Sequence, residues 1–136
     1  MTVKEYLSQA LYLDKRLRTK EKQLDWLKDH SVYVSSELSD MPKSSRAHRS
    51  ALEEAVVKIV DLETEIAIGI AELMQLQSSI AQVIRSTNNM ECETILEMRY
   101  LTFMSWEDIT VQLGYSQSYI YHLHRRALSL VRVPAA

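Results

Sequence analysis

The sequence predicts an all-α protein in which a long antiparallel, coiled-coil-like helical hairpin is followed by a three-helix domain of the helix-turn-helix type. The chain of 136 residues holds only two glycines and two prolines, which leaves little material for the turns of a β-sheet. Apolar residues recur at alternating spacings of three and four along two long segments, as on the buried faces of packed helices. A hydrophobic content of 46% is enough for a packed core.

The first long helix is predicted over residues 2–38. Its apolar seam is interrupted at Lys20 and Ser31, which we interpret as residues that fix the register of the helix pair rather than as ligands. The seam consists of Tyr6, Ala10, Leu13, Leu17, Leu24, Leu27, Val34 and Leu38.

The second long helix is predicted over residues 50–86 and has a wider apolar face. Its seam is interrupted at Glu63 and Gln77, and a flanking apolar stripe allows the helix to contact more than one neighbour. The seam consists of Leu52, Val56, Ile59, Ile66, Ile70, Leu73, Ile80 and Ile84, and the stripe of Ala55, Leu62, Gly69, Leu76 and Val83.

A hairpin built from two such helices leaves apolar surface that needs a cover. We expect two hairpins to pair into a four-helix bundle, which makes the protein a homodimer. The alternative is a monomer in which the C-terminal domain folds back and covers the hairpin.

The segment 39–49 between the two helices is predicted to be a loop, because it contains Pro42, several serines and no apolar periodicity. Its cations Lys43, Arg46 and Arg49 form a basic cluster. This cluster is either solvated or in contact with a DNA backbone or a polymerase, and we expect it to be solvated.

The heptad pattern stops near residues 86–89. We therefore place an oligomerisation domain at 1–89 and a second domain at 90–136. Asn88 or Asn89 can cap a new helix over residues 91–101, whose first turn carries acids that complement the helix dipole.

The next two helices are delimited by three residues. Ser105, with Asp108 three residues later, can cap a helix. That helix must end at Gly114, because only glycine enters the left-handed C-cap conformation without a steric penalty. Ser116 then caps the last helix. The core of this domain is expected to contain Cys92, Ile95, Met98, Tyr100, Leu101, Trp106, Ile109, Leu113, Tyr115, Leu123 and Leu128.

The last helix, predicted at about 117–131, has two distinct faces. Its apolar face consists of Ile120, Leu123, Ala127, Leu128 and Val131, at the spacing of one side of a helix. The opposite face carries side chains that hydrogen-bond, and residues at the N-terminal end of such a helix lie nearest the bases when it enters a DNA major groove. The candidate DNA-binding residues are Gln117, Ser118, Tyr121, His122, Arg125 and Arg126.

Four stretches of this region match a known pattern: Met98-Arg99-Tyr100, Glu107-Asp108-Ile109, Leu113-Gly114-Tyr115-Ser116 and Arg126-Ala127-Leu128. Together they resemble region four of bacterial sigma factors. The whole chain is similar to small regulators encoded by phages and prophages of Gram-positive bacteria, grouped near the ArpU and RinA late-gene activators. The resemblance implies DNA contacts at Gln117, Ser118, Tyr121 and His122. The chain departs from the pattern at Tyr121, where an arginine is common, so the base preference does not carry over.

The charge of the C-terminal domain argues against strong DNA binding by a single copy. Its arginines are Arg99, Arg125, Arg126 and Arg132, against the acids Glu91, Glu93, Glu97, Glu107 and Asp108. Because sequence-independent affinity comes from neutralised phosphates, we expect weak binding with a shallow salt dependence. Dimerisation would double the cationic footprint.

Other classes of function find no support in the sequence. The N-terminus lacks an apolar signal core, and the longest uncharged apolar run, 66–71, is far shorter than the roughly 20 residues that span a bilayer. A cytoplasmic protein without membrane contact is expected. The single cysteine, Cys92, is interpreted as a small core side chain. His122 and His124 point in different directions on one helix and cannot share a metal ion. Neither an enzyme nor a cofactor is expected.

Three hypotheses on function follow. The leading one is a sequence-specific transcriptional regulator that binds double-stranded DNA and dimerises through the hairpin. The second is an adaptor that docks on RNA polymerase with the sigma-like domain and has little DNA affinity of its own. The third is a phage small terminase subunit, which also joins a helix-turn-helix to an oligomerising hairpin but commonly places the DNA-binding part first.

Overall fold

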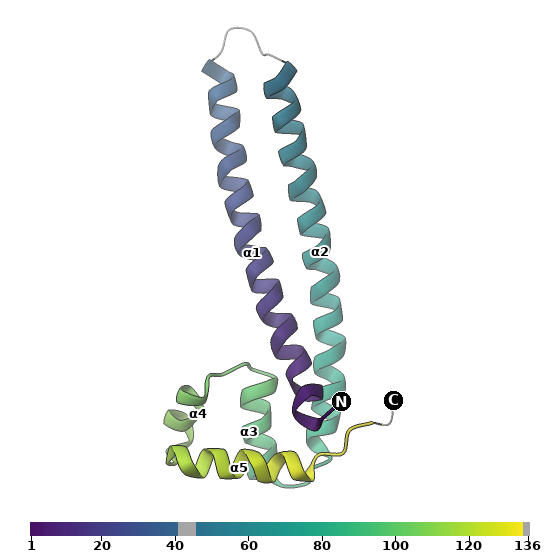
Figure 1. The fold of residues 1–136 in the computed structure, drawn as a ribbon, viewed down its shortest axis with the longest axis vertical. Helices are drawn as coiled ribbons and strands as arrows, with labels where there is room; N and C mark the ends of the chain where they lie inside the picture. Colours follow the sequence, from purple (N-terminus) through teal and green to yellow (C-terminus); the bar gives the residue numbers. More distant parts are fainter. Residues whose placement is uncertain (41–45, 135–136) are drawn as a thin grey trace. The chain divides into compact units, whose positions relative to one another are not determined.

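The computed structural model describes residues 1–40 and 46–134, apart from the side chains of 32–40 and 46–48. The described chain is all-α, as predicted, and its five helices are shown in Figure 1. They are α1 (Val3–Asp40), α2 (Arg46–Arg85), α3 (Met90–Tyr100), α4 (Trp106–Leu113) and α5 (Gln117–Leu130). Two compact units can be distinguished, residues 15–71 and residues 1–14 together with 72–136. The division between these units falls within the hairpin.

In the unit of residues 15–71, α1 and α2 pack as an antiparallel pair (Figure 1). Leu17 and Ile66 are buried between them, and Gly69 allows a close approach because the Leu17 side chain occupies the place of a glycine Cβ substituent. Lys20 Nζ lies 2.7 Å from a carboxylate oxygen of Glu65 on α2. This hydrogen-bonded pairing lowers the pKa of Glu65. The predicted role of Lys20 in fixing register agrees with this contact.

The helices extend further toward the tip of the hairpin than the predicted ranges of 2–38 and 50–86. Helix α1 ends at Asp40 and α2 begins at Arg46, so most of the predicted loop at 39–49 is helical where it is described. The physical reason is that residues 46–49 contain neither glycine nor proline, so nothing stops the helix that follows from starting there. Pro42 and Lys43 lie outside the described residues.

Six of the eight residues of the apolar seam predicted for α2 are buried or half-buried, whereas Val56 and Ile70 are exposed. The buried face combines part of the seam with the flanking stripe: Leu52, Ile59, Ile66, Leu73 and Ile80 alternate with Ala55, Leu62, Gly69, Leu76 and Val83. The seven-residue repeat is therefore kept, and Val56 and Ile70 lie at the other edge of the predicted face. The exposed side chains form a set that we call the valine–isoleucine face, consisting of Val56, Val57, Val60, Ile68 and Ile70.

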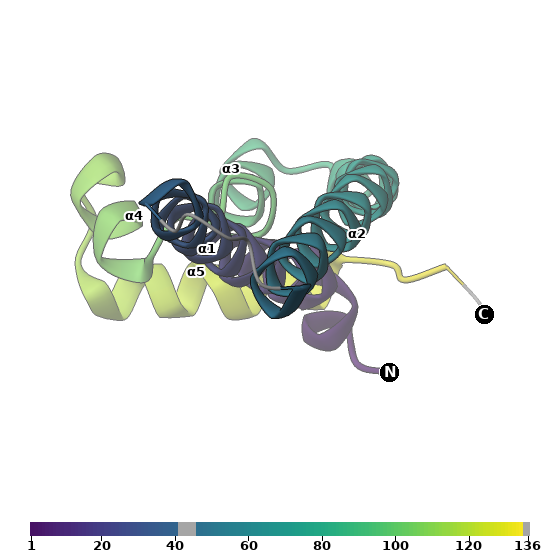
Figure 2. The same ribbon diagram turned by 90° about the horizontal axis from the view of Figure 1, so that it is seen from above.

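The second unit has a continuous hydrophobic core to which all five helices contribute. Within it, α5 begins beside α4 and runs past the end of α3, as the two views in Figures 1 and 2 show. Five of the residues predicted for the core are partly buried against it, namely Met98, Leu101, Trp106, Leu113 and Leu128. The buried residues are Leu7, Ala10, Ile80, Val83, Ile84, Cys92, Ile95, Leu96, Tyr100, Ile109, Ile120, Leu123, Ala127 and Val131.

One predicted core residue of this unit is on the surface. Tyr115 is 38% exposed and follows the turn at Gly114. The negative charge of Glu91 on α3, together with a hydrogen bond to it, raises the pKa of Tyr115. The ring of Tyr115 packs on that of Tyr119, with centroids 4.8 Å apart.

The capping residues read from the sequence occupy the positions predicted for them. The side chain of Asn89 accepts a hydrogen bond from the Cys92 amide at 3.0 Å, which places the start of α3 at Met90. Ser105 accepts from the Asp108 amide at 3.1 Å, and the side chain of Ser116 accepts from the third residue of α5 in the same way. Each cap satisfies an amide that the helix itself leaves without a partner.

Gly114 ends α4 with a φ of 70°, in the left-handed region. No atom lies within 4 Å of the place where a Cβ would be added, so backbone conformation alone determines the effect of a substitution. We expect Gly114→Ala to lower the free energy of unfolding by about 1 kcal/mol. Gly114→Asn is the matched control and should cost less, because asparagine tolerates this conformation. Urea denaturation measures both, and equal stability of the alanine variant and the wild type would contradict the explanation.

Candidate functional site

Helix α5 separates a buried side from an exposed side. Ile120, Leu123 and Ala127 are buried, and Val131 just after the helix continues this side. All six candidate residues from the sequence are exposed. Ser118, His122 and Arg125 follow one another at spacings of four and three, so they lie along one line of the helix surface. The structure thus gathers these three groups on one exposed strip.

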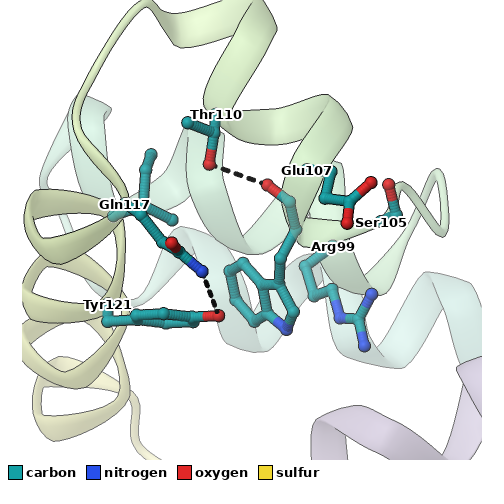
Figure 3. Close-up of a pocket in the computed structure, with 8 residues that line it drawn as sticks. Arg99, Ser105, Glu107, Thr110, Gln117 and Tyr121 are labelled. Carbon is teal, nitrogen blue, oxygen red and sulfur yellow. Dashed lines mark hydrogen bonds between the residues drawn. The ribbon is translucent and has the colours of Figure 1, made fainter.

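Gln117 and Tyr121 lie at one edge of this strip, next to α4. The Gln117 Nε2 donates a hydrogen bond to the Tyr121 hydroxyl at 3.2 Å, drawn as a dashed line in Figure 3. The Tyr121 ring meets the edge of Trp106, with centroids 6.0 Å apart. The two polar side chains are therefore held by each other and by an aromatic ring of α4.

The other edge of the strip faces α3. The Tyr119 hydroxyl donates to a carboxylate oxygen of Glu91 at 2.9 Å, and this hydrogen bond raises the pKa of Tyr119. Arg126 lies on this side too, because its charge acts on Cys92 of α3 and opposes the rise in thiol pKa that burial causes. Arg126 is thus separated from the line that Ser118, His122 and Arg125 form.

His124 is buried, and its role was missed in the sequence analysis. Its Nε2 lies 2.8 Å from the Tyr100 hydroxyl of α3, and the Trp106 ring approaches it at 4.5 Å between centroids. Burial lowers the pKa of His124 to about 4, helped by the charges of Lys4 and Arg99. Burial likewise raises the pKa of Tyr100 to about 12. A neutral imidazole that accepts a hydrogen bond from the Tyr100 hydroxyl is consistent with both the lowered pKa of His124 and the raised pKa of Tyr100.

Trp106 stands at the centre of these contacts. On the side of α3, the Arg99 guanidinium lies 4.9 Å from the Trp106 ring centroid. Arg99 is itself fixed, because its Nη1 donates to the Met104 carbonyl at 2.9 Å. The indole is thus contacted by a cation, by the His124 ring and by the Tyr121 ring. These contacts join α3, α4 and α5 around one side chain.

An open pocket of about 670 Å³ lies in front of this cluster (Figure 3). Arg99 lies on one side of it, and Gln117 and Tyr121 lie on the other. Polar and aromatic groups share the lining, and a carboxylate is among them. The lining residues are Arg99, Ser105, Trp106, Glu107, Thr110, Gln117, Ile120 and Tyr121.

Among the described residues, no group of three His, Cys, Asp or Glu side chains could hold a metal ion. His124 is buried and hydrogen-bonded to Tyr100, whereas His122 is exposed. No helix among the described residues is both long enough and apolar enough to cross a bilayer.

The fold defines a class of protein: an antiparallel pair of long helices followed by three short helices, with a capped, half-exposed last helix. This chain belongs to the family of proteins of unknown function DUF1492, whose model matches residues 34–131. No curated protein and no solved structure matches the chain.

The buried histidine makes stability depend on pH. The pKa of His124 is about 4 in the folded chain and near 6.5 when the group is free. Between these values the unfolded chain binds a proton that the folded chain does not, so stability is complete above about 6.5 and is lost as the pH falls toward 4.

We expect His124→Gln to reduce the pH dependence of the free energy of unfolding between about pH 4 and 6.5, as measured by urea denaturation at several pH values. His122→Gln, on the exposed face of the same helix, is the control and should keep the wild-type slope. A wild-type slope in the His124 variant would contradict the assignment.

Proposed function

We propose that this protein is a sequence-specific transcriptional regulator that binds double-stranded DNA with α5 and forms a homodimer through the hairpin. The observation that carries the proposal is the exposed strip of Ser118, His122 and Arg125, with Gln117 and Tyr121 beside it, on a helix whose opposite face is buried. A helix presented in this way matches the dimensions of a major groove. The resemblance to sigma region four and to phage regulators supports the same class, and suggests a phage or prophage origin.

Charge is distributed in a way that favours this use of α5. Arg125, Arg126 and Arg132 are exposed in the C-terminal half of α5 or just after it, while Glu91 and Glu93 lie in the first turn of α3, where Glu91 accepts a hydrogen bond from Tyr119. Cations toward the C-terminal end of α5 can contact phosphates while the uncharged groups nearer its N-terminus reach base edges. A regulator of this kind would act in the bacterial cytoplasm.

The exposed strip provides a direct test. We expect Tyr121→Ala, His122→Ala and Arg125→Ala each to weaken binding to a selected DNA site by about 1–3 kcal/mol, and Arg125→Ala also to lower the salt dependence by about one counterion. Fluorescence anisotropy at several salt concentrations measures both quantities. Glu97→Ala on the exposed side of α3 is the control and should bind like the wild type. Unchanged affinity in all three variants, with normal helicity, would remove the proposal.

The hairpin is proposed to hold the dimer together through the valine–isoleucine face of α2. Val57 and Val60 on this face are 57% and 54% exposed, and burial of such side chains drives association. A second copy fits as the partner because the segment 15–31 of α1 has more cations than acids, whereas 49–71 of α2 has more acids than cations. Pairing α1 of one copy with α2 of the other brings opposite charges together.

Sedimentation velocity tests this interface. We expect the combined change Val57→Asp and Val60→Asp to convert a dimer into a monomer, because it places carboxylates in an apolar contact. Lys58→Asp introduces the same side chain between these two positions but outside the face, and should leave the dimer intact. A dimer that survives the double change, or a wild-type chain that is monomeric or forms a larger ring, would contradict the proposed interface.

Docking on RNA polymerase is a second candidate function, favoured by one observation. Glu107 lines the same pocket as Gln117 and Tyr121, and its carboxylate would repel a DNA phosphate brought near it. A full-length protein that captures purified RNA polymerase, yet shifts no DNA in low salt, would favour this function over direct DNA recognition.

A further inference from the structure

The amide of Gln117 is oriented before any ligand binds. Its Nε2 donates to the Tyr121 hydroxyl at 3.2 Å, and the two side chains point toward one another in Figure 3. This bond uses one of the two amide hydrogens. The second amide hydrogen and the carbonyl oxygen remain available as a donor and an acceptor side by side. The hydrogen bond to Tyr121 fixes the orientation of the amide plane.

Tyr121 in turn is held from behind. Its ring meets Trp106 edge-on at 6.0 Å between centroids. Arg99 lies 4.9 Å from the Trp106 ring centroid and is anchored to the Met104 carbonyl. The chain of contacts from Arg99 through Trp106 and Tyr121 to Gln117 therefore restricts the rotation of the amide. A group fixed in this way loses less conformational entropy when it binds.

The chemistry of this arrangement selects one kind of partner. Glu107 lines the same pocket, and its negative charge disfavours a phosphate in front of Gln117. An uncharged base edge is compatible with it. The donor and acceptor of a glutamine amide match the N7 acceptor and the N6 donor of adenine in the major groove. Gln117 is also the first residue of α5, at the end of the helix that reaches bases in this mode of docking.

We propose that Gln117 and Tyr121 form one pre-oriented unit that reads an adenine, with Trp106 and Arg99 as positioning residues. This inference rests on the proposed DNA-binding function and adds to it the base that is read and the residues that aim the reading group. Arg99 acts here through the ring of Trp106 and not through a phosphate.

Selection of bound sequences from random DNA by the full-length protein tests the inference. The wild type should enrich a motif in which one position prefers adenine by about 5- to 150-fold, the discrimination of a bidentate base contact. Gln117→Ala should abolish the preference at that position only. Tyr121→Phe, which keeps the ring against Trp106 but removes the hydroxyl, should weaken it there. Tyr119→Phe is the matched control, because it removes a hydroxyl bonded to Glu91 on the other side of α5, and it should leave the motif unchanged.

Arg99 is tested by two substitutions whose results differ between the two roles. If Arg99 positions Trp106, Arg99→Lys keeps the charge but loses the planar stack, so it should weaken the adenine preference while the salt dependence stays as in the wild type. If Arg99 contacts a phosphate, Arg99→Gln should weaken all sequences alike and lower the salt dependence by about one counterion. Thermal melting by circular dichroism verifies that each variant is folded.

The outcomes separate this inference from the function on which it rests. A wild-type motif that keeps its adenine in Tyr121→Phe and Arg99→Lys overturns the positioning chain, and DNA binding stands. A different base at the position that Gln117→Ala affects overturns the adenine assignment alone. A wild-type protein that enriches no sequence overturns the proposed function, and this inference with it.

Discussion

The contact between α5 and α3 is the constraint on which the C-terminal unit depends. Ile120, Leu123 and Ala127 are buried in the shared core, and the hydrogen bond between Tyr100 and His124 satisfies the polar groups that this burial removes from water. Because one side of a helix is fixed in the core, the direction of every other side chain on it follows. The exposed strip of α5 is thus a consequence of packing on the opposite side.

Features set by neighbouring residues could be predicted from the sequence. The caps at Asn89, Ser105 and Ser116 and the left-handed turn at Gly114 each depend on a few consecutive residues, and the structure confirms them. The pairing of His124 with Tyr100 could not be predicted, since it joins residues that lie 24 apart. A polar residue on the border of the apolar face of α5 was the only available signal, and local pattern alone gives it no partner.

The long helices show a different limit of sequence reasoning. Alternating spacings of three and four identified both helices and most of their buried faces, but they also placed Val56 and Ile70 in the contact, where the structure exposes them. The apolar face of α2 is three positions wide, and the pattern alone does not say which edge of it the partner helix leaves uncovered. The number and the order of the helices and most of their buried faces were therefore predictable, whereas the edge of the contact on α2 was not. Identification of the candidate residues at the surface required only the period of one short helix, and their grouping with Trp106 and Arg99 required the fold.

The single thiol of the chain has a practical consequence. Cys92 is fully buried beneath α5, and burial raises its pKa, so it is unreactive while the core is closed. Alkylation of Cys92 therefore reports how often the C-terminal core opens. The opening of this core can therefore be measured on the wild-type chain, without an engineered label.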